Sequence, residues 1–197
     1  MSIEFRAARP DDAAGILSIY APYCESSTVS FEIIAPTVEQ MCDRITRITA
    51  RYPWLVAEID GRVVGYVYAS QHRERAAYRW MIDVAVYVAP RQQRRGLGRA
   101  LYSALFSILR HQNYVKAFAG ITLPNPGSIG LHEALGFRPI AVYRGVGYKA
   151  GRWLDVGWWQ LDLQPEGGDP REPCDFGPIS ASAAVAAALA EAKRLLV

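Results

Sequence analysis

The sequence predicts a mixed α/β domain, and three observations support this prediction. Strand-like segments alternate with segments of helical periodicity along most of the chain. Antiparallel hairpins are expected near both ends, with a strand–helix–strand unit between them. Hydrophobic residues make up 51% and charged residues 21% of the 197 residues, which suffices for one core and excludes a disordered chain.

The first predicted elements are a strand, a helix and a loop. Ile3–Ala8 predicts a short strand, and Asp11 or Asp12 then caps a helix that reaches about Tyr23. Residues Cys24–Ile34 are first polar and then apolar without a helical period. They therefore predict a loop over one end of the fold.

A second helix and a hairpin come next. The helix is expected to start at Pro36, since Thr37 and Gln40 have the spacing of a capping box. Its buried stripe consists of Met41, Ile45, Ile48 and Tyr52. Two strands, 54–59 and 63–70, are expected on either side of the Asp60-Gly61 dipeptide, which suits a tight turn.

The second half of the domain predicts strands around two further helices. In order, the segments are an extended run Tyr78–Val88, a helix after Gln93–Arg99, a strand Val115–Thr122, a helix Ser128–Leu135, and the strands Arg138–Val146 and Trp153–Leu163. Gly136 is a suitable residue to end the shorter helix. The total is about seven strands and about four helices.

The composition changes after Leu163, which predicts a domain over residues 1–164 and a tail over residues 165–197. The tail begins with a stretch rich in proline, glycine and charge. Ser180–Val197 then has strong helix-forming residues and a thin apolar stripe. We expect this tail to pack either on the domain or on a partner subunit.

Charge and cysteine content narrow the class of protein. The chain has 22 basic and 19 acidic residues, a net charge of +3 that is too small to indicate nucleic-acid binding. Cys24, Cys42 and Cys174 lie far apart, which argues against a disulfide framework or a thiolate zinc site and favours a reducing cytoplasm. His72 and His111 have no motif context and are expected at the surface, so no metal site is predicted.

Neither end of the chain predicts a targeting or membrane segment. The first twelve residues carry charges where a signal peptide needs an apolar core. The most apolar stretch, ISASAAVAAALA, is too short and too rich in alanine to span a bilayer. An intracellular protein without a membrane partner is therefore expected.

The sharpest local motif is an apolar strand, Val84–Pro90, followed by Gln93–Arg99 and a helix. Glycines allow backbone N–H groups to approach an anion, while the helix N-terminus and the arginines add positive charge, so a pyrophosphate is the expected ligand. The alternative is a surface turn with solvated arginines. A P-loop is excluded because no GxxxxGK string occurs, and a dinucleotide fingerprint because Leu101 stands where its third glycine would be.

The string Gln93-Arg94-Arg95-Gly96-Leu97-Gly98 resembles the acetyl-CoA loop of the GNAT superfamily of N-acetyltransferases, Q/R-x-x-G-x-G/A. Asn125, Ser128 and Leu131–Phe137 extend the resemblance to the next helix. The stretches RYPWLVAE, VYVAPRQQRRGLG, LHEALGF and GYKAGRWLDVGWWQ resemble phosphinothricin N-acetyltransferases and their amino-acid-acetylating relatives, which act on methionine sulfone or sulfoximine. The match covers roughly Ile3–Leu163.

The resemblance implies a mostly antiparallel sheet whose two central parallel strands splay apart, with acetyl-CoA bound in the gap. The main chain of Val86, Tyr87 and Val88 would bond the pantetheine arm and polarise the thioester carbonyl. Asn125 and Ser128 would contact the same arm. The cradle for the pyrophosphate would consist of Arg94, Arg95, Gly96, Leu97, Gly98 and Arg99.

The resemblance also implies two residues for proton transfer. Asp83 stands where the family commonly has a glutamate that takes the proton from the amine, directly or through an ordered water. The alternative for Asp83 is an outward-facing or salt-bridged residue. His132 stands where many members have a tyrosine thought to protonate the leaving thiolate. Its alternative is a half-buried helix histidine that bonds a backbone carbonyl.

The acceptor pocket is the least specific part of the resemblance. Tyr78, Arg79 and Trp80 align with the segment that lines it in related enzymes, and Arg79 could pair with the α-carboxylate of an amino acid. Phe31 and Lys149 are weaker candidates for the pocket wall. Their alternatives are a core aromatic and a solvated lysine.

The resulting functional prediction is an acetyl-CoA-dependent N-acetyltransferase of a small amino-acid-like amine. The alternatives are acetylation of an antibiotic or a protein N-terminus, or a non-catalytic acyl-CoA-binding module. A nucleic-acid partner is not expected, because RQQRRGLGR lacks an aromatic stacking platform. A homodimer is expected from the resemblance and from Trp158 and Trp159, one of which leaves the core and requires cover from a second subunit or from the tail.

Overall fold

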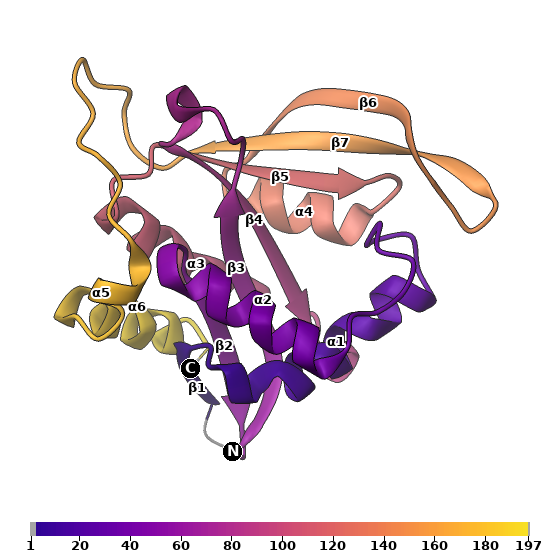
Figure 1. The fold of residues 1–197 in the computed structure, drawn as a ribbon, viewed down its shortest axis with the longest axis horizontal. Helices are drawn as coiled ribbons and strands as arrows, with labels where there is room; N and C mark the ends of the chain where they lie inside the picture. Colours follow the sequence, from indigo (N-terminus) through magenta and orange to yellow (C-terminus); the bar gives the residue numbers. More distant parts are fainter. Residues whose placement is uncertain (1–2, 197) are drawn as a thin grey trace.

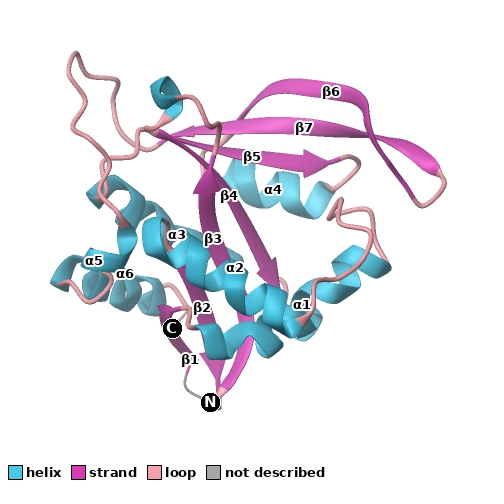
Figure 2. Ribbon diagram, viewed as in Figure 1, coloured by secondary structure: helices cyan, strands magenta, loops and turns pink. Residues whose placement is uncertain are grey.

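The computed structural model describes residues 3–196, so Met1, Ser2 and Val197 lie outside the described residues. Within that range a seven-stranded sheet carries helices on both faces (Figure 1, Figure 2). The strands are β1 (Ile3–Ala7), β2 (Trp54–Ile59), β3 (Arg62–Gln71), β4 (Met81–Val88), β5 (Lys116–Thr122), β6 (Arg138–Lys149) and β7 (Arg152–Asp162). The helices are α1 (Ala13–Glu25), α2 (Val38–Arg51), α3 (Leu97–His111), α4 (Pro126–Ala134), α5 (Phe176–Ile179) and α6 (Ala183–Arg194).

The sheet is antiparallel except at its centre. The strand order is β1-β2-β3-β4-β5-β7-β6, and only β4 and β5 are parallel neighbours among the described strands. Their pairing joins Met81–Asp83 to Lys116–Phe118 and ends there, although both strands continue. Beyond Asp83 the two strands therefore separate. The predicted mixed, mostly antiparallel sheet with splayed central strands is confirmed.

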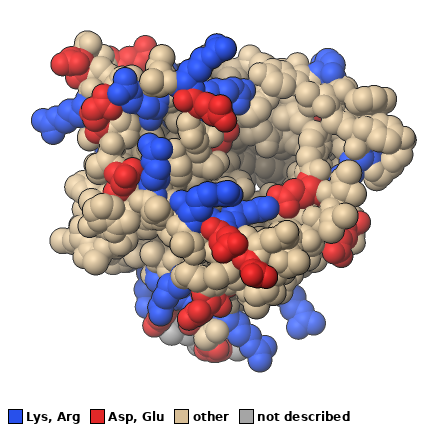
Figure 3. Space-filling model, in the orientation of Figure 1, with Lys and Arg blue, Asp and Glu red and all other residues tan. Residues whose placement is uncertain are grey.

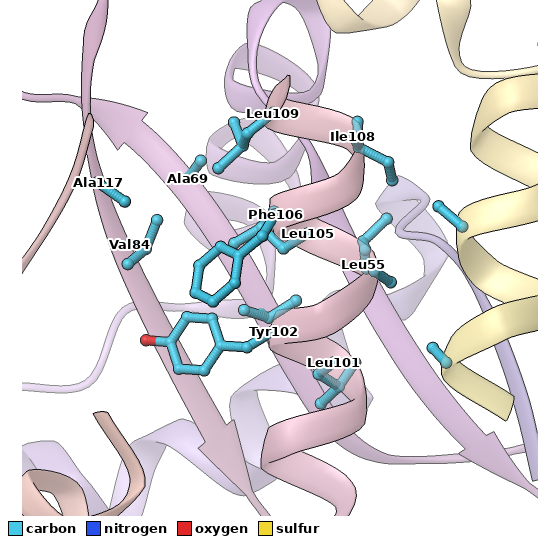
Figure 4. Close-up of a cluster of buried hydrophobic side chains, with 14 of the residues drawn as sticks. Leu55, Ala69, Val84, Leu101, Tyr102, Leu105, Phe106, Ile108, Leu109 and Ala117 are labelled. Carbon is cyan, nitrogen blue, oxygen red and sulfur yellow. The ribbon is translucent and has the colours of Figure 1, made fainter. Parts of the chain in front are cut away.

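Each face of the sheet has its own helical layer. On one face α3 buries an apolar row against the strands, shown in Figure 4, which includes Leu101, Leu105, Ile108 and Leu109. On the other face α1 and α2 pack around Trp54. Because side chains alternate along a strand, Val84 of β4 joins the α3 cluster while Tyr87 packs against α1.

Local capping explains where three helices begin. The Thr37 hydroxyl accepts the N–H of Gln40 at 3.1 Å, and the Gln40 side chain accepts the N–H of Thr37 at 2.9 Å. This reciprocal pair confirms the predicted capping box. Asn125 caps α4 and Ser182 caps α6 through their side-chain oxygens.

Strand β4 begins later than expected, and the prediction of an extended run from Tyr78 is wrong. Ala76–Tyr78 form a 3-10 turn, and the strand starts at Met81. The N–H of Arg79 donates to the Ala76 carbonyl at 3.1 Å, and the Arg79 Nε donates to the same oxygen at 3.0 Å. These local hydrogen bonds hold the turn in place of an extended backbone.

The tail folds back on the domain, which is the first of the two expected positions. Phe176 of α5 is buried, and α6 packs against α3 with an alanine-rich face in the same core: Val185, Ala188 and Ala192. Glu172 pairs with Arg79 ahead of α5. The expected end of the tail helix, Val197, lies outside the described residues. No described helix combines the length and the apolar composition needed to cross a bilayer.

Trp158 and Trp159 lie on opposite faces of β7, as strand alternation predicts. Trp159 belongs to the core and is 6% exposed. Trp158 lies over Gly120 and against Tyr143, with the Arg73 guanidinium 5.8 Å from its ring. Side chains of the same domain thus cover Trp158, and neither the tail nor a second subunit is required for that purpose.

Candidate active site

The site is built around the gap between β4 and β5. Past Asp83 the facing edge of β4 has no strand partner, so its main-chain donors and acceptors are open to a ligand. A cavity of about 70 Å³ lies in this gap, between Val84–Tyr87 of β4 and Ala119–Thr122 of β5. The space-filling view in Figure 3 shows that the molecule is hollowed over this region, between α2 and the β6–β7 hairpin.

A larger cleft of about 490 Å³ adjoins the gap at the beginning of α3, and we call it the α3 cleft. The structure brings to it all the residues predicted to hold the cofactor except Arg95, which is exposed beside it. The predicted residues that line the cleft are Val86, Tyr87, Val88, Arg94, Gly96, Leu97, Gly98, Arg99, Asn125 and Ser128.

The N-terminus of α3 gives the α3 cleft features that suit an anion. Gly96 is the N-cap, with φ at +80°, a conformation that side-chain-bearing residues rarely adopt. Among the described residues no side chain caps this helix, so the amides of its first turn remain available to a ligand. Arg94 and Arg99 add full positive charges to the helix dipole.

Asn125 links the α3 cleft to α4. Its Oδ1 accepts the N–H of Ser128 at 3.1 Å, which fixes the start of α4 and leaves the side-chain NH₂ to donate elsewhere. Both residues line the α3 cleft and the gap cavity. This position suits a ligand arm that runs from the α3 cleft into the gap. That Asn125 and Ser128 contact such an arm stays a prediction.

Asp83 lies at the last paired position before β4 and β5 separate, opposite Phe118. It projects on the same face of β4 as Tyr87, since the two are four residues apart in a strand. Its side chain is 28% exposed, and its Oδ1 lies 2.6 Å from Nδ1 of His72. Burial raises the pKa of the Asp83 carboxyl, although the hydrogen bond with His72 opposes that shift.

The expectation that His72 is a surface residue is wrong. Its side chain is 12% exposed, and the ring stacks on Phe118 with centroids 4.4 Å apart. The edges of Tyr78 and Trp158 face the same ring. His72 follows β3 directly, and β3 pairs with β4 so that Ser70 lies opposite Asp83. The register of β3 against β4 could have placed His72 beside Asp83, but no local motif in the sequence indicates that register.

His132 is buried on α4, with both ring nitrogens engaged. Nδ1 lies 2.7 Å from the Ser128 carbonyl, which can only accept, so Nδ1 carries the hydrogen. Nε2, 2.9 Å from the hydroxyl of Tyr102, then accepts from it. Burial lowers the pKa of His132, with the carbonyl contact opposing, so the imidazole is neutral at neutral pH. The bond to the Ser128 carbonyl is the contact expected of a helix histidine without a catalytic role. Protonation of the leaving thiolate by His132 stays a prediction.

The acceptor candidates separate into two groups. Tyr78 lies near His72, with ring centroids 6.0 Å apart. Arg79 instead pairs with Glu172 of the tail at 2.9 Å, and the Trp80 indole donates to the Arg171 carbonyl. The side chains of Arg79 and Trp80 thus hold the tail in this structure. A role of Arg79 in carboxylate binding would require it to leave that ion pair.

Phe31 and Lys149 join the loop after α1 to the β6–β7 hairpin. The Phe31 ring lies against Gly147. Lys149 is 9% exposed, and its ammonium donates to the carbonyls of Ser30 at 2.6 Å and Glu32 at 2.8 Å. The alternative of a solvated lysine is therefore wrong. Lys149 holds the loop that borders the gap.

We expect Lys149→Met to lower the free energy of unfolding by about 1–3 kcal/mol, because buried carbonyls would lose their donor. Methionine keeps most of the aliphatic stem, so the loss reports on the ammonium. Chemical denaturation would measure it, with Lys193→Met on exposed α6 as the control. Equal stability of the two variants would contradict the assigned role.

Comparison with known proteins agrees with this geometry. Residues 5–158 match the acetyltransferase (GNAT) domain family. The chain is 43% identical over 162 residues to a phosphinothricin N-acetyltransferase of Streptomyces viridochromogenes, covering 82% of this chain and 88% of that protein. It is 36% identical over 167 residues to an L-methionine sulfoximine/L-methionine sulfone acetyltransferase of Pseudomonas aeruginosa, covering 84% and 97% of the two chains.

A solved structure is similar over a comparable range. The crystal structure of a phosphinothricin acetyltransferase from Sinorhizobium meliloti in complex with AcCoA has a TM-score of 0.82 and 33% sequence identity. The similarity covers 92% of this chain and 100% of that one. The family match includes β4, the α3 cleft and α4. The chain therefore belongs to the GNAT acetyltransferase family.

Proposed function

We propose that this protein transfers the acetyl group of acetyl-CoA to the amine of a small amino-acid-like acceptor. The observation that carries the proposal is the α3 cleft, where an uncapped helix N-terminus and arginines adjoin a gap between splayed strands. The first feature suits a pyrophosphate, and the second suits an extended arm with amide groups. Together they match the two ends of coenzyme A.

The reaction needs a neutral amine, because an ammonium has no lone pair for attack. Loss of one proton to a base lets the nitrogen attack the thioester carbonyl carbon, so that a C–N bond forms and the C–S bond breaks with CoA leaving as thiolate. The nitrogen then loses its second proton, which balances the protonation of the departing thiolate to the thiol of CoA. Asp83 lies at the point where the gap opens, and in this proposal it is part of the group that accepts the proton. Main-chain donors of Val86–Val88 would stabilise the developing oxyanion.

The acceptor class follows from the relatives. Their names specify phosphinothricin, methionine sulfoximine and methionine sulfone, which are all amino acids with a polar, tetrahedral side-chain group. A thiol-release assay with these three acceptors, an aminoglycoside and an N-terminal peptide would identify the class. Binding of acetyl-CoA without release of thiol for any of them would favour the non-catalytic acyl-CoA-binding alternative.

We expect acetyl-CoA to raise the melting temperature of the protein, because a ligand that binds only the folded state stabilises it. The gain is about 2.7 kcal/mol at a concentration a hundred times the dissociation constant. Differential scanning fluorimetry would measure the shift, with NADH as a pyrophosphate nucleotide that lacks pantetheine. An unchanged melting temperature with acetyl-CoA would contradict the proposed function.

We also propose a homodimer that acts in the cytoplasm. Strand β6 is an edge of the sheet and exposes large apolar side chains: Ile140, Val142, Tyr143, Val146 and Tyr148. An exposed apolar edge strand suits a subunit interface. Light scattering at micromolar concentration would test it, and a monomer would contradict it. Three free cysteines fit a reducing compartment.

A further inference from the structure

His72 and Asp83 form a hydrogen-bonded pair at the point where β4 and β5 separate. Nδ1 of His72 and Oδ1 of Asp83 are 2.6 Å apart, slightly shorter than the range of about 2.7–2.9 Å for a charge-assisted N–H···O hydrogen bond. An ionised carboxylate only accepts hydrogen bonds, so the hydrogen between them belongs to Nδ1. Nε2 of the neutral imidazole therefore carries the lone pair.

The ring of His72 is held in one orientation. Phe118 stacks on it with an interplanar angle of 16°, and Trp158 and Tyr78 meet it edge-on. Within the described residues no hydrogen-bond partner contacts Nε2. Nε2 is thus the ring nitrogen that the pair leaves free, and the packing of the ring, rather than a second polar group, fixes its direction.

We propose that His72 accepts the proton from the ammonium of the acceptor, and that Asp83 orients its imidazole and stabilises the imidazolium. The proposal rests on the proposed function and names the atom that takes the proton. One N–H bond of the ammonium breaks, Nε2 gains the hydrogen, and the neutral amine keeps the electron pair with which it attacks the thioester. The charge moves from the acceptor to His72, beside the Asp83 carboxylate.

Imidazole suits this task better than a carboxylate alone, since a general base is most effective when its pKa lies near the working pH. The charged and titratable groups around the pair act in both directions. Burial raises the pKa of the Asp83 carboxyl, whereas His72 and the Arg73 guanidinium, which lies over Trp158, lower it. Tyr68 of β3 stays neutral, because burial raises its pKa. The Tyr78 ring lies at a steep angle to the imidazole, with ring centroids 6.0 Å apart.

His72→Asn is the sharpest test, because the asparagine NH₂ can still donate to Asp83 while no titratable atom remains at the place of Nε2. We expect kcat/KM to fall by about 10²–10⁴-fold. Acetyl-CoA affinity should be unchanged, since His72 does not line the α3 cleft. His111→Asn, at an exposed histidine, is the matched control and should keep full activity.

The pH profile separates proton transfer from a merely structural role. The acidic limb of kcat/KM that reports protonation of the base should disappear in His72→Asn. Combining it with Asp83→Asn should cost little more than either change alone, because the two residues act as a unit. If His72→Asn keeps the activity and the pH profile of the parent, His72 does not take the proton. That result leaves the proposed function intact, which fails only if the parent enzyme releases no thiol.

Discussion

Asp83→Asn is expected to lower kcat/KM by about 10²–10⁴-fold, the usual loss when a general base is disabled. Asparagine keeps the shape of the side chain but removes the charge that orients His72 and stabilises its protonated form. The loss should shrink as the pH rises, because more acceptor then arrives as the neutral amine. Steady-state kinetics with a saturating acetyl-CoA concentration would measure it.

Acetyl-CoA affinity and folding provide the controls for that variant. Asp83 does not line the α3 cleft, so the dissociation constant of acetyl-CoA should not change. Asp169→Asn, on the exposed tail, controls for the loss of one negative charge. An Asp83→Asn enzyme with full activity at neutral pH would remove the carboxylate from the mechanism.

The stability of Asp83→Asn should change in the opposite direction to its activity. Burial raises the pKa of folded Asp83 above its unfolded value, so ionisation of this carboxyl opposes folding. That penalty is absent below the unfolded pKa and grows as the pH rises through the folded pKa. At neutral pH the variant should thus melt no lower than the parent. A large fall in melting temperature would identify Asp83 as a structural residue instead.

Gly96→Val is expected to weaken acetyl-CoA binding by about tenfold to a hundredfold. A β-branched residue at φ +80° is strained by about 1–3 kcal/mol, and 1.4 kcal/mol corresponds to a tenfold change in affinity. The added Cβ would also lie 3.2 Å from Leu196. The loop would relax by moving the amides of the first turn of α3 away from the phosphates. Isothermal titration with acetyl-CoA would measure the loss.

Gly61→Val is the matched control for the change at Gly96. Gly61 has φ +76° in the turn between β2 and β3, with no other residue near its Cβ position. The backbone strain is therefore similar, but the position lies outside the α3 cleft. This variant should lose stability and keep its acetyl-CoA affinity. If both variants bind acetyl-CoA as the parent does, the α3 cleft is not the phosphate site.

Most of the fold and the glycine-containing turn before α3 could be predicted because their signals are local. The capping box at Thr37 and Gln40 needs only the spacing of two residues. The spacing of Gly96 and Gly98 predicts a backbone that can approach an anion, and the structure places both residues at the start of α3. The start of β4 could not be predicted, because the hydrogen bonds of Arg79 with Ala76 compete with the extended pattern.

The side chains around the gap show where local signals end. Arg79 looks like a carboxylate-binding residue in sequence, yet Glu172, far along the chain, pairs with it. Lys149 looks solvated, yet its ammonium donates to three carbonyls, that of Tyr23 at the end of α1 and those of Ser30 and Glu32 in the following loop. The partners of both residues lie in distant segments of the chain, and no local sequence pattern indicates that these segments come together.

The acetyl-CoA loop and the candidate base Asp83 came from the resemblance to a known family, whereas the sequence by itself determined the mixed sheet, the order of its elements and the glycine-containing turn before α3. These depend on periodicity, capping and glycine positions, which act between residues close in the chain. Only the tertiary structure decided three contacts. His72 is hydrogen-bonded to Asp83, the Tyr102 hydroxyl is hydrogen-bonded to Nε2 of His132, and the tail packs against α3. The physical reason is that a pairing of strands or a helix packed on a sheet joins residues distant in sequence, and their contacts follow from the assembled core.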